Sequence, residues 1–105
     1  MTDEEETTPE FARKLHRIKV GNDTEPRKLG WAIYKFYQEG KLPVLVGIGV
    51  AAAGQAMKAV AVANGHLAPS GVIFDVFPHF GTVEEEHVNG GDMRALVLDL
   101  RERKL

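Results

Sequence analysis

Cysteine is absent from this chain of 105 residues, so disulfide bonds contribute nothing to its stability. The absence fits a reducing compartment. No apolar run approaches the roughly 20 residues that a membrane-spanning helix needs. Residues 1–10 carry five acidic side chains and no lysine or arginine, unlike a secretory or mitochondrial signal. We therefore expect a single-domain cytoplasmic protein that does not enter a membrane.

Side chains for catalysis and metal binding are scarce as well. The single serine, Ser70, lies in the turn sequence Pro-Ser-Gly and has no nucleophile motif around it. No metal-ligand pair at helical spacing is formed by the four histidines, His16, His66, His79 and His87. The run Glu84–His87 could gather a divalent cation on a loop, but a solvated charge run explains it better. The sequence therefore predicts no enzyme, no cofactor and no bound metal.

Charge is distributed unevenly along the chain. The net charge of −2 comes from 13 basic and 15 acidic residues, and nine of the acids lie in residues 1–10 and 84–92. The remaining body has 13 basic against six acidic residues. A positive body with acidic appendages suggests a polyanionic partner with some negative modulation. The alternative is a solubilising tail on an ordinary mixed surface.

The central stretch, residues 42–71, is the most informative one. It begins with an apolar run without alternation, typical of a strand that is central in a sheet or buried on both faces, formed by Val44, Leu45, Val46 and Ile48. Gly47 and Gly49 then allow the backbone and a helix start to approach closely. Residues 47–52 have the form G-x-G-x-x-A of a dinucleotide fingerprint, but the short chain and the missing acidic residue argue against that cofactor.

The helix that follows, over about residues 52–64, is apolar almost all the way round. Only Gln55 and Lys58, with Asn64 at the end, form a polar stripe. A helix of this kind buries more than one side. In so short a chain, we expect the second cover to be another subunit.

Shorter patterns predict the remaining elements. Residues 1–14 are expected to form an acidic, disordered tail before a folded domain over residues 15–105. Residues 15–20 and 94–101 alternate as strands, and residues 72–77 form a strand whose Pro78 limits its end and suggests an edge position. Thr24 is a good N-cap for a first helix, with Pro26 in its first turn and Gly40 after its last.

The resulting order, β-α-β-α-β-β, predicts an α+β fold. Right-handed crossovers place both helices on one face of a four-stranded mixed sheet, which gives a two-layer sandwich. The core face of the first helix is formed by Leu29, Ala32, Ile33, Phe36 and Tyr37. Trp31 and Tyr34 lie on the opposite side, where two large aromatic side chains suggest a contact surface.

Several basic residues are placed where they could line a phosphate-tracking surface. They are Arg17 and Lys19 on one face of the first strand, Arg27 and Lys28 at the start of the first helix, Lys58 beside Gln55 on the second helix, and Arg94 before the last strand. Each alone is more often a plain surface charge. The set as a whole favours a nucleic-acid partner.

The stretch GVAAAGQAMKAVAVANGHLAPSGV, residues 49–72, resembles the stage V sporulation protein S family. The resemblance extends over about 85 residues, from His16 to Arg101. It implies the Alba fold of small chromatin-type proteins, a homodimer, and nucleic-acid binding without catalysis. Alba-type proteins grip nucleic acid with the loop before the second helix, the start of that helix and a basic hairpin. In this chain the first two correspond to Gly49 to Lys58.

The expected hairpin and the loop before the first helix depart from that pattern. The loop has no lysine-rich run and carries Asp23 and Glu25 beside Arg27 and Lys28. Glu84-Glu85-Glu86 replaces the expected basic character and would repel phosphates. We therefore expect a dimeric, regulatory DNA- or RNA-binding protein, of the kind that controls genes in sporulation or development, rather than a packaging protein. The expected dimer interface contains Trp31, Tyr34, Ala56, Ala59 and Val60. The alternative is a protein-interaction module that uses the exposed aromatic side chains and the acidic hairpin.

Overall fold

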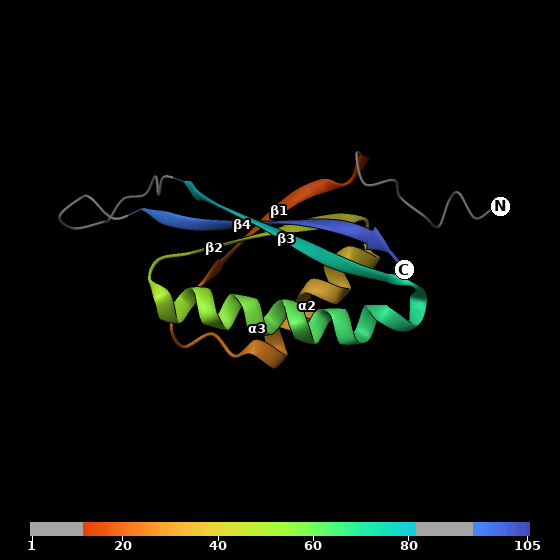
Figure 1. The fold of residues 1–105 in the computed structure, drawn as a ribbon, viewed down its shortest axis with the longest axis horizontal. Coiled ribbons are helices and arrows are strands. Elements are labelled where there is room, and N and C mark those ends of the chain that lie inside the picture. The colour runs from red at the N-terminus through yellow and green to blue at the C-terminus, as the bar shows by residue number, and fades with distance from the viewer. Residues whose placement is uncertain (1–11, 82–93) are drawn as a thin grey trace.

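The computed structural model describes residues 12–81 and 94–105, which form four strands and two α-helices (Figure 1). In chain order the elements are β1 (Lys14–Val20), α2 (Pro26–Gln38), β2 (Lys41–Gly47), α3 (Val50–Leu67), the short 3-10 helix η2 (Ala68–Ser70), β3 (Val72–Gly81) and β4 (Ala95–Lys104). The predicted α+β class and the order β-α-β-α-β-β are confirmed. None of the helices in these two ranges is long and apolar enough to cross a membrane.

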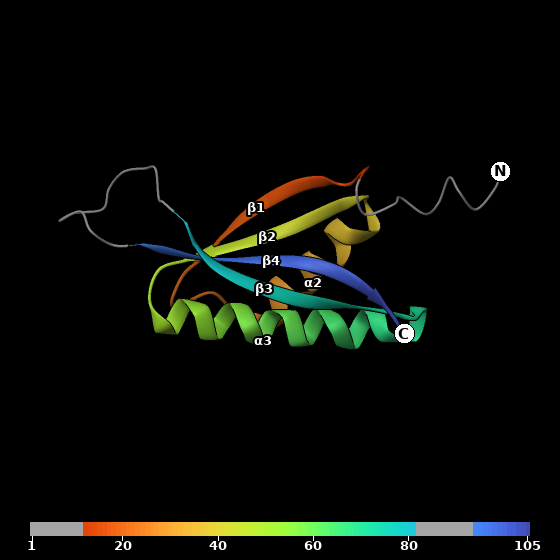
Figure 2. The same cartoon turned by 45° about the horizontal axis from the view of Figure 1, so that its top comes forward.

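The four strands form one mixed sheet with the order β1-β2-β4-β3. β1 and β2 are parallel, whereas β4 runs antiparallel to both of its neighbours. β2 is therefore central, as its unbroken apolar run predicts, and β3 is an edge strand, as Pro78 suggests. Both helices lie on the same face of the sheet, which gives the predicted two layers (Figures 1 and 2).

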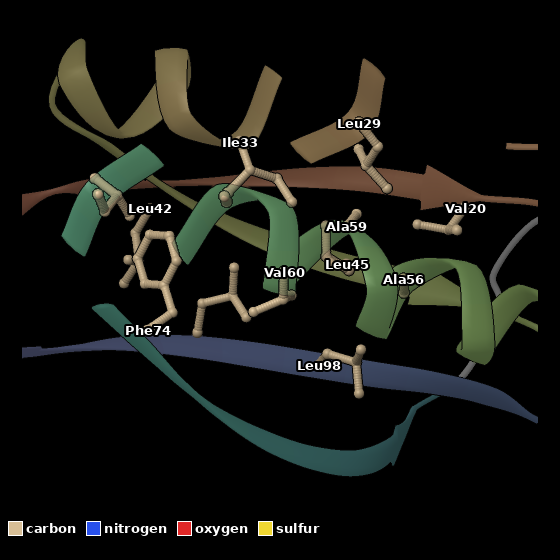
Figure 3. Packing of buried hydrophobic residues seen from close by; sticks show 13 residues of the cluster. Val20, Leu29, Ile33, Leu42, Leu45, Ala56, Ala59, Val60, Phe74 and Leu98 are labelled. Atoms are coloured by element: carbon tan, nitrogen blue, oxygen red, sulfur yellow. The ribbon is translucent and has the colours of Figure 1, made fainter. Parts of the chain in front are cut away.

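The core lies between the helices and this face of the sheet. Leu29 and Ile33 of α2 point toward α3, where Ala59 and Val60 belong to the same buried cluster (Figure 3). On β4 the predicted alternation is confirmed, because Leu98 and Leu100 belong to the core cluster. The remaining buried members of the cluster are Val20, Leu42, Leu45, Ala56, Ala59, Ala63, Leu67 and Phe74.

The ends of several elements differ from the sequence prediction. The third strand does not end at Pro78, which pairs with Leu98, and it continues to Gly81. Proline is tolerated there because β3 is an edge strand with one free side. Ile48 lies beyond the end of β2, and α3 is longer at both ends than predicted. The expected hairpin turn lies outside the described residues.

The N-cap of α2 is Glu25, not Thr24 as predicted. Thr24 instead uses its hydroxyl oxygen to accept a hydrogen bond of 2.8 Å from the backbone N–H of Gly21. That bond closes the β1–α2 turn, so the side chain is not available to cap the helix. Pro26 occupies the first helical position, and Gly40 follows the C-cap residue with φ of 87°, both as predicted.

The two helices cross closely at Gly30. A Cβ atom at this position would lie 2.6 Å from the Cβ of Val62 and 2.8 Å from the carbonyl oxygen of Ala59. Such distances are too short for any other residue without a shift of the helices. The buried glycine in the middle of α2 thus sets how near α2 and α3 approach one another.

Asn64, the last member of the predicted polar stripe, joins α3 to the free edge of β3. Its side-chain oxygen accepts a hydrogen bond of 2.8 Å from the N–H of Phe74, and its amide nitrogen donates to the carbonyl oxygen of the same residue at 3.3 Å. Since β4 occupies only one side of β3, this amide takes the place of a strand neighbour at one residue.

The first strand begins at Lys14, one residue before the domain boundary predicted from composition. Lys14 opens β1, and the side chain of Arg13 is only 5% exposed. Arg13 donates a 2.7 Å hydrogen bond to the carbonyl oxygen of Tyr37, and its guanidinium lies 3.9 Å from the centre of the Tyr37 ring. The Tyr37 hydroxyl donates in turn to Glu102 at 2.7 Å. Residues 1–11 of the predicted tail lie outside the described residues.

Candidate nucleic-acid interface

The junction of β2 and α3 is built by two glycines with different roles. Gly47 allows α3 to approach the sheet, because a Cβ there would lie 2.9 Å from the Cβ of Ala52. Gly49 precedes the helix with φ of 94°, a backbone conformation that other residues rarely adopt, and its carbonyl accepts the bond from Ala53 at 3.1 Å. Both glycines of the G-x-G pattern are therefore explained by the turn and the packing of α3.

The β1–α2 loop is held against the first half of α3. The side-chain amide of Gln55 donates a hydrogen bond of 3.3 Å to the carbonyl oxygen of Asn22. This bond links two segments that the sequence places among the candidate binding positions. It also gives Gln55 a structural role, which its place in a polar stripe does not predict.

Arg27, Lys28 and Lys58 are exposed on this helical side of the molecule. Lys28 lies 3.9 Å from Glu25, but both side chains are exposed, and such pairs contribute about 0–1 kcal/mol. Arg27 and Lys58 have no carboxylate partner among the described residues. We call Gly49, Gln55, Arg27, Lys28 and Lys58 the helical-side set.

The other predicted binding residues lie elsewhere. Arg17 and Lys19 alternate with Ile18 of the core, so they belong to the face of the sheet opposite the helices. Arg94 directly precedes β4, and its guanidinium lies 5.5 Å from the centre of the Phe80 ring. The predicted set is thus divided between two sides of the sheet and the N-terminal end of β4.

Three of the residues predicted for a dimer interface are buried within the single chain. Ala56, Ala59 and Val60 are at most 4% exposed and belong to the core cluster. They cannot form a contact surface unless the core opens, because they lie on the side of α3 that covers the sheet. The exposed side of α3 carries instead Val50, Ala51, Gly54, Met57, Lys58, Ala61, Gly65 and His66.

The predicted aromatic pair on α2 contacts a histidine of α3. The rings of Trp31 and Tyr34 stack at 5.3 Å, and His66 of α3 contacts both, at 4.7 Å from Trp31 and 5.5 Å from Tyr34. Trp31 remains 48% exposed, whereas Tyr34 packs partly against the core. The pair therefore has a structural partner that spacing on one helix does not reveal.

Sequence reasoning missed the charged and aromatic side chains on the strands of the hairpin. Arg101 and Arg103 of β4 and Phe77 of β3 lie on the same side of the sheet as Arg17 and Lys19. The alternation along β4 could have indicated that Arg101 and Arg103 face away from the core, because they alternate with the core leucines of that strand. Only the strand order places these residues beside those of β1.

Side chains that bind metal ions are scattered over the described part of the chain. No group of three or more histidine or acidic side chains that could hold a metal ion occurs within residues 12–81 and 94–105. The acidic run Glu84–His87 lies outside the described residues. The accessible polar groups are chiefly cations, which suit contacts to an anionic partner.

These features define a small two-layer α+β domain with a four-stranded mixed sheet and cationic side chains on both sides. A comparison with protein families identifies the same family that residues 49–72 resemble. Residues 16–101 match the stage V sporulation protein S family, so the chain belongs to that family. Membership implies a role connected with sporulation.

Proposed function

We propose that this protein is a small, dimeric, non-catalytic nucleic-acid-binding protein with a regulatory role in sporulation. The proposal joins the family membership to the charge distribution of the folded body. It assigns no reaction to the protein, because its candidate site consists of cations, an amide and backbone groups rather than an acid–base pair.

The observation that carries the proposal is the unequal pairing of charges. Of the six acidic side chains in the described part of the chain, five contact a cation, a histidine or a tyrosine hydroxyl; they are Glu25, Glu39, Asp75, Asp99 and Glu102. In contrast, Arg17, Lys19, Arg27, Lys58, Arg94 and Arg101 have no carboxylate partner among the described residues. This excess of free cations favours a polyanion such as nucleic acid.

The helical-side set supplies a contact region for phosphates. Gln55 fixes the β1–α2 loop beside α3, and Lys58 lies one turn further along the same helix. A lysine in this position contacts phosphate as a mobile point charge, so it contributes to affinity rather than to sequence choice. This placement agrees with the region expected from the Alba-type resemblance.

Lys58→Glu tests the helical-side set. We expect weaker binding to labelled duplex DNA and RNA in a salt series, and a log–log salt slope reduced by about 1 for the lost phosphate contact. Lys35→Glu, in the last turn of α2, gives the same change of net charge at another position and serves as the control. Equal effects of both substitutions would show that only the net charge of the protein matters. Unchanged binding by Lys58→Glu would contradict a phosphate contact at Lys58.

A second candidate function is a protein-interaction module, favoured by the ring cluster of Trp31, Tyr34 and His66. Trp31 is half exposed yet held in place by two rings, which suits an anchor at a protein interface. Binding at such a surface depends weakly on salt, whereas nucleic-acid binding falls steeply. The same salt series therefore separates the two functions.

A further inference from the structure

The face of the sheet opposite the helices has a chemistry of its own. Here we call it the open face, and define it by Arg17 and Lys19 of β1, Val44 and Val46 of β2, Asp75, Phe77 and His79 of β3, and Val97, Asp99, Arg101 and Arg103 of β4. The register and the alternation of the strands place these side chains together. No described helix covers this face, and α2 lies behind the sheet in Figure 2.

Both acidic side chains of the open face are already engaged. Two guanidinium nitrogens of Arg103 donate hydrogen bonds to Asp75 Oδ1, Nη2 at 2.9 Å and Nε at 3.1 Å. His79 Nε2 lies 2.9 Å from Asp99 Oδ2. Each contact runs diagonally between β3 and β4, as expected for side chains on one face of an antiparallel pair.

The cations that remain lie on β4 and β1, to one side of a half-exposed ring on the edge strand β3. Arg17, Lys19 and Arg101 have no carboxylate partner among the described residues, so their charge is available to a ligand. Phe77 is 51% exposed, and the Arg101 guanidinium lies 5.7 Å from its ring centre. An aromatic ring that leaves half its surface in water beside free cations is suited to stack with a flat, negatively charged partner.

We propose that the open face binds single-stranded nucleic acid, with a base stacked on Phe77 and the backbone held by Arg17, Lys19 and Arg101. The inference rests on the proposed function and adds the strand type and the surface. Single strands are favoured because their bases are free to stack on a protein ring, whereas duplex bases stack on one another. Four strands span about 14 Å, and the four-stranded sheet of RNA-recognition motifs, which is a different fold, stacks two or three bases.

Substitutions at Phe77 test the stacking. The probes are fluorescently labelled ten-nucleotide single strands of RNA and DNA, with a duplex of the same sequence. Phe77→Leu keeps an apolar side chain but removes the ring, and we expect single-strand affinity to fall about tenfold. Phe77→Tyr keeps the ring and should bind like the wild type. Phe80→Leu is the matched control, because Phe80 is an exposed ring on the same strand that points to the other face.

The cations give a second, independent readout. Arg17→Ala and Arg101→Ala should each lower the log–log salt slope for single strands by about 0.7, the value for one phosphate contact. Lys35→Ala removes one charge from α2 and should leave the slope unchanged. Far-UV circular dichroism and thermal melts of every variant establish that the fold persists.

Four results would overturn the inference, and only the first of them also contradicts the proposed function. A wild-type protein that binds no nucleic acid contradicts both. If the wild type binds nucleic acid and Phe77→Leu binds equally well, only the open-face site is contradicted. A dimer that Phe77→Leu converts to monomers identifies the face as an interface between copies. If Phe77→Leu does not fold, ultraviolet crosslinking of wild-type protein decides: crosslinks to β3 and β4 support the site, and crosslinks confined to α3 contradict it.

Discussion

The Tyr37 hydroxyl lies in a cluster that joins the first described residues to α2 and β4. Burial, and then the hydrogen bond to Glu102, raise the pKa of Tyr37 from 10.0 to about 12. Because the pKa is higher in the folded state, the stabilisation is complete below pH 10 and is lost as the pH rises toward 12. The site is partly exposed, so we expect Tyr37→Phe to lower the free energy of unfolding by about 1 kcal/mol at pH 8.

Chemical denaturation of wild type and Tyr37→Phe at several pH values measures this difference. The difference in free energy of unfolding between the two proteins should shrink between pH 10 and 12. Because both proteins contain the same lysines, taking this difference cancels the effect of lysine titration. A difference that stays constant through pH 12 would show that the hydroxyl does not titrate with the expected shift.

Gly30 gives a second prediction for a single residue. In an ordinary helix interior, replacing glycine with alanine stabilises a protein by about 0.5–1 kcal/mol. At Gly30 the new methyl group would meet Val62 and the backbone of Ala59, so we expect Gly30→Ala to destabilise by about 1–3 kcal/mol. Gly54→Ala, on the exposed side of α3, meets no atom of its own chain within 4 Å and should stabilise the isolated chain, although not a dimer packed against this side; a gain at both sites would contradict the close crossing.

Which residues could be predicted from the sequence depends on how far apart their partners lie along the chain. Gly47 and Gly49 were predicted because their neighbour, the start of α3, follows within a few residues. Gly30 and Arg13 were not, since their partners lie on other elements: Val62 on α3, and Tyr37 on α2. Composition assigned Arg13 to the tail for the same reason, because a local pattern cannot reveal a buried long-range contact.

The edge of β3 provides a test at the scale of an element. Asn64→Ala removes both hydrogen bonds to Phe74 and leaves a partly buried backbone N–H and C=O without their partner. We expect a loss of about 1–3 kcal/mol in the free energy of unfolding. Hydrogen exchange should also become faster at Phe74, because its N–H is no longer bonded.

Gln55→Ala is the matched control for Asn64→Ala. It removes another side-chain amide of α3, but one whose single hydrogen bond to Asn22 is exposed and 3.3 Å long. Its effect on stability should stay within about 0.5 kcal/mol. Equal losses from both substitutions would argue that Asn64 acts through α3 alone and does not protect the strand edge.

Elements were predicted better than their boundaries. Hydrophobic period identified all four strands and both helices, because burial on one face leaves a strong alternating or helical pattern. Boundaries depend on weaker local terms: Thr24 bonds to its own turn rather than to α2, and Pro78 is accommodated by the free edge of β3. The predicted binding residues lie on two sides of the sheet for a related reason. A sequence does not show whether a face of one strand and a face of a distant helix lie on the same side of the molecule.

At the scale of the whole molecule, the two layers separate two cationic surfaces. The helical-side set belongs to one and Arg17, Lys19 and Arg101 to the other, with the sheet between them. Under the proposed function, this arrangement would let the protein contact two segments of nucleic acid, or one strand that passes around the sheet edge. Both arrangements differ from the single continuous surface that the basic residues suggest when they are read along the sequence.

Self-association is the last property of the whole molecule to be tested. The exposed side of α3 carries the small residues Gly54, Ala61 and Gly65, and no atom lies within 4 Å of a Cβ built at either glycine. Glycines inside a helix cost about 1 kcal/mol each, and a second chain packed closely against them would account for that cost. We therefore expect the dimer to form through this outer side of α3, and not through the buried Ala56, Ala59 and Val60. Lys58 is exposed on the same side, so its proposed phosphate contact requires that the dimer leave it accessible, and Lys58→Glu is measured for self-association as well as for binding.

Ala61→Glu places a charge at the centre of this outer side and should convert the dimer to a folded monomer. Sedimentation velocity over a range of protein concentrations measures the change, and circular dichroism monitors the fold. Leu15→Glu, at an exposed apolar residue of β1, introduces the same charge in the other layer and should leave the dimer intact. If Ala61→Glu remains dimeric while Leu15→Glu dissociates, the chains associate through the sheet, and the open face is then not available to nucleic acid.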